Sequence, residues 1–139
     1  MRIEMRITNE AQIYELRRKL REMLDGNCTP EESAEIQTAV IELARNALNY
    51  TGSGDIAVEI ADVLLTVVCE DNGPGILEWD IKKYDVLEQN KSLGFGLGIV
   101  SRLMDTMDIH TEAGKGTRVV ATRRLGIRTG PPPKAEGNK

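Results

Sequence analysis

The sequence lacks the features that mark membrane, secreted and nucleic-acid-binding proteins. No apolar run in its 139 residues approaches the length of a membrane-spanning helix, and the N-terminal stretch has no signal-peptide core. Acidic and basic residues are mixed along the chain, with a net charge of -4 and no basic stripe that would follow a phosphate backbone. We therefore expect a cytoplasmic protein that binds neither nucleic acid nor membrane.

Cysteine and histidine are also scarce, which limits the chemistry that the side chains offer. The two cysteines, Cys28 and Cys69, do not have the spacing of metal ligands. We expect both to be reduced, structural thiols. His110, the sole histidine, falls on a predicted strand, where a surface or cross-strand position is expected instead of a catalytic one.

The apolar pattern predicts one domain over residues 1–125 and a disordered tail over residues 126–139. A chain of this length suits a single domain, and the tail contains the run Gly130-Pro131-Pro132-Pro133, which favours disorder. Alternating apolar and polar residues indicate strands, and apolar residues repeated every three or four positions indicate helices. The strands are predicted at 2–7, 55–60, 63–70, 109–112 and 117–124, and the helices at 10–24, 30–50 and 99–107.

Capping and turn signals set several of these boundaries. Thr29, Pro30 and Glu32 predict a capping box with proline in the first helical position. The first hairpin is predicted to turn at Ala61-Asp62, and the last to close across residues 113–116. The simplest packing of this order is an α/β (α+β) two-layer sandwich, with a mixed, mostly antiparallel sheet and helices on one face.

Glu42 and Asn46 lie one turn apart on the second predicted helix, which is otherwise patterned for burial. A carboxylate and an amide are costly to bury without partners. One interpretation pairs Glu42 with Arg45 or another surface cation and leaves Asn46 solvated. In the other, Asn46 is a ligand of Mg²⁺, whose remaining ligands are phosphate oxygens and waters, and Glu42 accepts a proton from an attacking hydroxyl or orients it.

Asp71 directly follows a strand that is predicted to be central, and a turn with two glycines comes after it. A carboxylate at a strand end beside a cleft can accept a hydrogen bond from the exocyclic amine of adenine. Gly73 leaves room for the base or a water, and Gly75 can take a positive φ. An ordinary loop between two elements explains the same residues about equally well.

Two further glycine-rich turns carry weaker signals. The turn from Gly94 to Leu97 precedes a predicted helix, so its backbone N–H groups and the helix dipole can hold phosphate oxygens. A flexible loop is the alternative there. After the last turn, Thr117 opens a strand, where its hydroxyl can reach the adenine side of a pocket through water. The alternative for this turn is a plain hairpin connection.

Taken in order, the four segments resemble those of the GHKL (Bergerat-fold) ATPases, the superfamily that includes gyrase and the histidine kinases. Glu42-x-x-x-Asn46 resembles the N box. Asp71-x-Gly73-x-Gly75 resembles the adenine-side glycine box, Gly94-Phe95-Gly96 the second glycine box, and Gly114-x-Gly116-Thr117 the last motif. The stretches 42–46 and 102–105 are most similar to anti-sigma-factor-type serine/threonine kinases, in particular to the switch kinases of stressosome pathways.

The resemblance implies an ATP- and Mg²⁺-dependent protein serine/threonine kinase. Its expected substrates are STAS-domain partners, either anti-sigma antagonists or stressosome scaffold proteins, and a PP2C-type phosphatase or a sigma factor is a further expected partner. Glu42 is then catalytic, and Asn46 holds the metal. The implied nucleotide-binding residues are Asn46, Asp71, Gly73, Gly75, Ile76, Gly94, Phe95, Gly96, Leu97 and Thr117.

The main alternative is a partner-switching binding module, which would sequester or activate a STAS scaffold, a sigma factor or a phosphatase with little catalysis. A histidine kinase fragment is disfavoured, because no predicted helix offers a phosphoacceptor histidine. Hydrolysis of the gyrase type is disfavoured as well, because no second domain is predicted that would supply a catalytic lysine.

Overall fold

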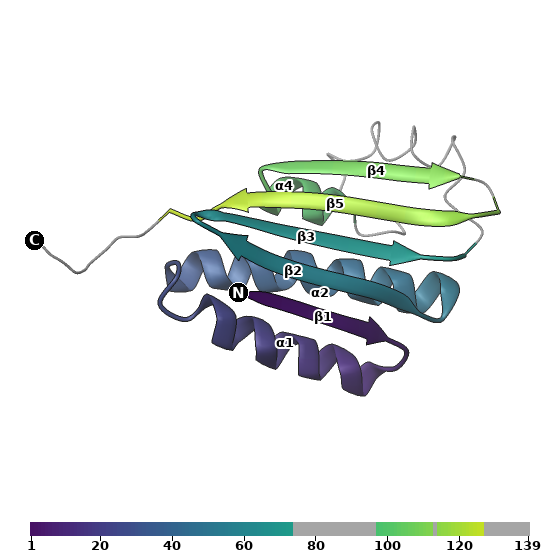
Figure 1. Ribbon diagram of the computed structural model, residues 1–139, viewed down its shortest axis with the longest axis horizontal. Coiled ribbons are helices and arrows are strands. Elements are labelled where there is room, and N and C mark those ends of the chain that lie inside the picture. The colour runs from purple at the N-terminus through teal and green to yellow at the C-terminus, as the bar shows by residue number, and fades with distance from the viewer. Residues whose placement is uncertain (74–96, 113, 127–139) are drawn as a thin grey trace, which may run out of the picture.

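The computed structural model describes residues 1–73, 97–112 and 114–126, which form two layers (Figure 1). The strands are β1 (Arg2–Ile7), β2 (Gly54–Ala61), β3 (Leu64–Asp71), β4 (Thr106–Glu112) and β5 (Gly116–Arg124), and the helices are α1 (Glu10–Leu24), α2 (Pro30–Thr51) and α4 (Leu97–Leu103). The strands form one sheet in the order β1-β2-β3-β5-β4. The helices cover one face of that sheet (Figure 1). No helix in these ranges is long and apolar enough to cross a membrane.

The architecture confirms the predicted α/β sandwich with helices on one face. The predicted mixture of parallel and antiparallel neighbours is wrong for the described strands, because all four of their pairings are antiparallel. Strand β5 lies between β3 and β4. The C-terminal end of β3 therefore lies beside the N-terminal end of β5, and this edge of the sheet is where the candidate site forms.

Local capping explains where α1 and α2 begin and end. The Asn9 side chain accepts a hydrogen bond from the backbone of Gln12 at the start of α1. Thr29 and Glu32 form the predicted capping box of α2, and Gly52 ends that helix with a φ of 87°, a left-handed conformation that suits glycine. These caps confirm the predicted helix starts at residues 10 and 30, and α2 runs to Thr51, one residue further than predicted.

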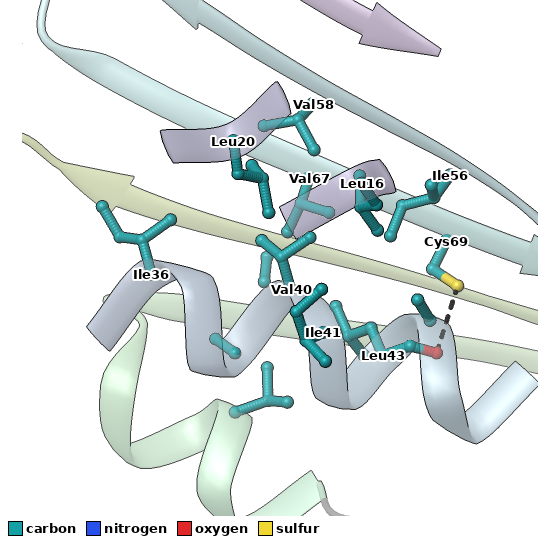
Figure 2. Close-up of a cluster of buried hydrophobic side chains, with 14 of the residues drawn as sticks. Leu16, Leu20, Ile36, Val40, Ile41, Leu43, Ile56, Val58, Val67 and Cys69 are labelled. Atoms are coloured by element: carbon teal, nitrogen blue, oxygen red, sulfur yellow. Dashed lines mark hydrogen bonds between the residues drawn. The ribbon is translucent and has the colours of Figure 1, made fainter. Parts of the chain in front are cut away.

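The hydrophobic core fills the space between α2 and the sheet (Figure 2). Alternate residues of the strands face the helices, as the period of two requires. The strongest packing comes from side chains that are at most 2% exposed, because burying a Leu, Ile or Val contributes about 1.5–3 kcal/mol. In Figure 2 these include Leu16, Leu20, Ile36, Val40, Leu43, Ile56, Val58 and Val67.

Both cysteines are free thiols, as predicted. Cys69, on β3, is buried and donates its S–H to the backbone oxygen of Leu43 in α2, with 3.5 Å between sulfur and oxygen (Figure 2). Burial raises the pKa of Cys69 to about 12, so the thiol stays protonated at neutral pH. This hydrogen bond joins the strand that ends at Asp71 to the helix that carries Glu42.

The structure corrects two predicted boundaries. The turn between β2 and β3 is at Asp62-Val63 instead of Ala61-Asp62, because Ala61 pairs with Leu64 and Asp62 takes a φ of 57°. Aspartate tolerates this left-handed region better than most residues.

The second correction concerns α4, which spans Leu97–Leu103 instead of the predicted 99–107. The Asp105 backbone N–H bonds to Thr122 O at 2.8 Å, and its carboxylate accepts the Arg124 N–H at 2.7 Å. These contacts draw the chain into β4. Met107, which fits the helical pattern, instead packs on the core from a strand.

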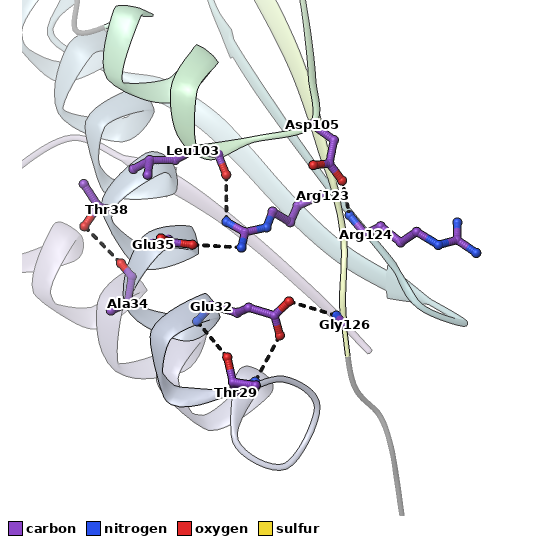
Figure 3. Close-up of polar contacts among 10 residues, drawn as sticks. All are labelled: Thr29, Glu32, Ala34, Glu35, Thr38, Leu103, Asp105, Arg123, Arg124 and Gly126. Atoms are coloured by element: carbon purple, nitrogen blue, oxygen red, sulfur yellow. Dashed lines mark hydrogen bonds and ion pairs between the residues drawn. The ribbon is translucent and has the colours of Figure 1, made fainter.

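Polar contacts fasten α4 and the end of β5 to α2 (Figure 3). The Arg123 guanidinium donates to the Leu103 carbonyl at the end of α4 and to Glu35 of α2, each at 2.8 Å. Glu32 accepts the backbone N–H of Gly126 at 2.9 Å. Gly126 is the first residue of the predicted tail, and the rest of that tail, 127–139, lies outside the described residues.

Candidate functional site

The site begins with one edge of α2. Glu35, Glu42 and Asn46 are spaced i, i+7 and i+11, which places them on one side of the helix. Glu35 bonds to Arg123 of β5, and α4 packs against α2. This edge therefore faces β5 and α4. Arg45 lies on another side and pairs with Glu10 of α1 at 3.1 Å.

Glu42 and Asn46 are half-buried on this edge. Within residues 1–73, 97–112 and 114–126, neither side chain makes a hydrogen bond or an ion pair. Arg45, the cation predicted to neutralise Glu42 in one interpretation, instead gives both its bonds to the Glu10 carboxylate. The carboxylate and the amide oxygen thus remain available to a ligand from this side of the molecule.

A row of polar side chains crosses the sheet at the end of β3. Asp71 pairs with Thr117 of β5, and Thr117 pairs with Thr111 of β4. Cross-strand partners share a face of the sheet, and the alternation from Cys69 and Val119 places this row on the helix-covered face. Thr117 is only 9% exposed, and its Oγ1 lies 3.1 Å from the Thr111 Oγ1.

Two glycines, Gly73 and Gly116, allow neighbouring segments of the chain to lie close to Asp71 and the end of α2. The Gly73 N–H donates to the Asp71 carboxylate at 2.9 Å, and a Cβ on Gly73 would lie 2.1 Å from the Thr51 Cγ2 in the last turn of α2. Thr51 is five residues after Asn46, or about 7.5 Å along the helix axis. Gly73 thus brings the Asp71 turn against the end of the helix that carries Asn46.

Gly116 occupies a position where only glycine fits. Its φ is 107°, and an added Cβ would lie 2.1 Å from the Asp71 backbone oxygen. Alanine at Gly116 is therefore expected to push β5 away from β3. The free energy of unfolding should fall by about 1–3 kcal/mol beyond the cost of the positive φ. Urea unfolding measures this loss, and ATP titration should show weaker binding as well.

The matched control for this substitution is Gly114→Ala in the same hairpin. Gly114 has a φ of 79°, but an added Cβ there meets nothing within 4 Å. The free energy of unfolding of that variant is expected to fall only by the cost of the left-handed backbone, about 1–2 kcal/mol. Equal losses in the two variants would contradict the close approach of Gly116 to Asp71.

The other predicted residues lie outside this cluster or outside the described residues. Leu97 is the first residue of α4, and its side chain is 1% exposed and belongs to the hydrophobic core. Its predicted contact with phosphate, which would use its backbone N–H, stays a prediction. The predictions for Gly75, Ile76, Gly94, Phe95 and Gly96 all fall on residues that the structure does not describe.

Sequence reasoning missed Thr111. The predicted hairpin closed across 113–116 and so paired Glu112 with Thr117, whereas Glu112 pairs with Gly116. A one-residue change of register moves side chains to the other face, and it is this change that brings Thr111 beside Thr117. Two threonines on either side of a glycine-containing hairpin were the only available signal.

The arrangement has the chemistry to hold a purine nucleotide. Asp71 offers an acceptor at the sheet end, Thr117 adds a buried hydroxyl, and Asn46 and Glu42 supply oxygens from α2 that have no partner among the described residues. In the described part of the chain, no three His, Cys, Asp or Glu side chains gather in a way that could hold a metal ion. A cation at Asn46 would then take most of its ligands from phosphate and water, which suits Mg²⁺.

Comparisons with known proteins identify the family of this chain. Residues 7–123 match the family described as histidine kinase-like ATPase domain. The serine/threonine-protein kinase RsbT of Bacillus subtilis (strain 168) is 42% identical over 100 residues, which cover 68% of this chain and 74% of RsbT. An anti-sigma F factor of Clostridium perfringens (strain SM101) is 26% identical over 106 residues, which cover 70% of this chain and 76% of that protein.

Two solved structures share the fold. Full-length ShkA, in complex with AMPPNP, superposes with a TM-score of 0.55 at 20% identity, covering 84% of this chain and 31% of ShkA. The chain therefore spans about a third of the length of ShkA. The catalytic domain of histidine kinase ThkA gives a TM-score of 0.52 at 15% identity, covering 88% of this chain and 96% of that domain. The family match and the relatives confirm the predicted kinship with GHKL ATPases and anti-sigma-type kinases, and the chain belongs to the histidine kinase-like ATPase domain family.

Proposed function

We propose that this protein is an ATP-dependent protein serine/threonine kinase of the anti-sigma, switch-kinase type. The observation that carries the proposal is the placement of two sets of groups: Asp71 and Thr117 at one sheet end, and Glu42 and Asn46, which have no partner in the described part of the chain, on the adjacent edge of α2. The identity of 42% to the kinase RsbT supports the same reaction class. Phosphoryl transfer depends chiefly on positioning and charge stabilisation, so a small set of groups suffices.

Each residue has a distinct role in this proposal. The Asp71 carboxylate accepts a hydrogen bond from the exocyclic amine of adenine, and Thr117 bonds to the same side of the base. Gly73 leaves space beside the backbone for the base or a water. The glycine-rich segment from Gly94 to Gly96, together with Gly75 and Ile76, completes the nucleotide site in our proposal.

The donor set also fits Mg²⁺. Asn46 offers one neutral oxygen near the position proposed for the phosphates, and the ion would supply charge neutralisation on the phosphate chain. Glu42, one turn from Asn46, accepts the proton of the attacking serine or threonine hydroxyl or orients that hydroxyl. Arg45 does not compete for this role of Glu42, because it is held by Glu10.

The proposed substrates are STAS-domain proteins, either anti-sigma antagonists or stressosome scaffolds. A sigma factor or a PP2C-type phosphatase is a further proposed partner. The names of the anti-sigma F factor relatives favour a second candidate function, in which the domain acts by binding its partner with little catalysis.

The test is incubation with labelled ATP, Mg²⁺ and STAS-domain proteins encoded near this one, followed by phosphoamino-acid analysis. We expect acid-stable label on serine or threonine of one such protein. Acid-labile label on histidine would contradict the serine/threonine assignment. Calorimetry that shows no heat on nucleotide titration would overturn ATP binding, and partner binding without any phosphate transfer would support the binding module instead.

A further inference from the structure

One flank of α1 carries charge and apolar surface that the nucleotide site does not use. Tyr14, Arg17 and Arg21 are spaced i, i+3 and i+7, which places them on one side of the helix. Glu10, one turn before Tyr14, lies on the same side and pairs with Arg45 of α2. This side of α1 therefore borders α2, and we call Tyr14, Arg17 and Arg21 the α1 flank.

Tyr14 is the most exposed large apolar side chain in the described ranges, at 72%. Arg21 is exposed as well, and Arg17 is half-buried. Tyrosine and arginine are enriched at contacts between proteins, where they supply much of the binding energy. The α1 flank thus has the composition of a protein-binding surface.

The two arginines of the α1 flank carry positive charge that the described residues do not neutralise. Within residues 1–73, 97–112 and 114–126, neither Arg17 nor Arg21 forms an ion pair. The glutamates of α1 already have arginine partners, at distances of 2.5 to 3.1 Å: Glu10 pairs with Arg45, and Glu15 and Glu22 pair with Arg18. Arg17 and Arg21 are therefore available to carboxylates of another molecule.

The α1 flank lies close to the residue proposed to act on the acceptor hydroxyl. Helices α1 and α2 pack side by side (Figure 1). They run in opposite directions, because the start of α1 meets the late part of α2 through Glu10 and Arg45, whereas Arg21 lines a groove of about 460 Å³ with Ser33 and Gln37 of early α2.

This register places Tyr14 level with the turn of α2 that contains Glu42. Tyr14 comes one turn after Glu10, and Glu42 comes nearly one turn before Arg45, the partner of Glu10. The axes of packed helices lie about 8–10 Å apart, and a protein partner typically covers about 800 Å². One partner can therefore contact the α1 flank and present a hydroxyl across α2 to Glu42.

We propose that the α1 flank is a docking surface for an acidic face of the protein substrate. This inference rests on the proposed function, in which Glu42 acts on a serine or threonine of that substrate. Tyr14 packs against the substrate, and Arg17 and Arg21 bond to its carboxylates. The protein has a net charge of -4, and charges in salt solution act over about 10 Å. Carboxylates of the substrate therefore gain attraction where they lie opposite these arginines, which fixes its orientation.

The experiment uses the full chain and the STAS-domain proteins of the labelling assay. Calorimetry measures the Kd of each protein whether or not phosphate is transferred, and the labelling assay gives KM and kcat. The variants are Tyr14→Ala, Arg17→Glu and Arg21→Glu. Lys19→Glu is the matched control for the two arginine variants. Lys19 is on the same helix, two positions from each arginine, which places it on the other side of α1.

We expect Arg17→Glu and Arg21→Glu each to raise the Kd and the KM of the protein substrate at least about 10-fold, because like charges would then face each other. Tyr14→Ala should raise both about 5- to 30-fold, the range for an aromatic residue that contributes strongly to binding. The kcat and the Kd for ATP should stay within about twofold in all three variants, because the α1 flank contacts neither the nucleotide nor the reacting groups. Lys19→Glu should change none of these quantities by more than about twofold.

Unchanged affinity for the substrate in both arginine variants would overturn the inference, and so would an equal loss in Lys19→Glu. If the arginine variants kept that affinity but no longer bound vesicles of phosphatidylglycerol, the α1 flank would be a membrane contact instead. Absence of binding to every one of the STAS-domain proteins would overturn it as well. Binding that depends on the α1 flank without any phosphate transfer would support the docking surface and contradict the proposed kinase function.

Discussion

Replacing Glu42 with glutamine is expected to lower the rate of phosphoryl transfer by about 10²- to 10⁴-fold, the usual contribution of a general base. Glutamine keeps the size of the side chain but cannot accept the proton of the attacking hydroxyl. The Kd for ATP should stay within about threefold, because Glu42 is proposed to act on the acceptor hydroxyl and not on the nucleotide. Single-turnover transfer of labelled phosphate and calorimetry measure the two quantities separately.

Glu35→Gln is the matched control for this substitution. Glu35 lies on the same edge of α2, seven residues earlier, but its carboxylate is held by Arg123 at 2.8 Å. We expect normal phosphoryl transfer from this variant, with a small loss of stability. A Glu42→Gln protein that transfers phosphate at the normal rate would remove Glu42 from the reaction, and it would favour the binding module if partner activation also persisted.

Replacing Asp71 with asparagine is expected to weaken ATP binding by about 10- to 100-fold, because a hydrogen bond to a charged group is worth about 1.5–3 kcal/mol. The asparagine oxygen can still accept the Gly73 N–H, which Asp71 accepts at 2.9 Å. The turn should therefore keep its shape, and unfolding measurements should show little change. Calorimetric titration with ATP gives the affinity.

Glu70→Gln tests whether the loss is specific to Asp71. Glu70 is the preceding residue of β3, but its side chain lies on the other face of the sheet, paired with Arg118 at 3.0 Å. That variant should bind ATP normally. If Asp71→Asn kept full affinity while Glu70→Gln lost it, the adenine side of the site would have to be reassigned to the open face.

Local signals in the sequence predicted most of the secondary structure. The capping residues Asn9 and Thr29 act within their own first helical turns, so they predict helix starts without any tertiary contact. The alternation in β1 likewise depends on neighbouring residues alone. The early end of α4 could not be read in this way, because Asp105 bonds to Arg124 and Thr122, which come later in the chain.

By itself, the sequence determined which side chains this site has available. The spacing of Glu42 and Asn46 fixes them on one side of a helix, and the end of a buried strand fixes Asp71 at the rim of the sheet. Only the tertiary structure decided which partners these groups have. It paired Arg45 with Glu10 and placed Thr111 beside Thr117. Ion pairs and strand register join segments that are distant in sequence, and short-range periodicity carries no information about them.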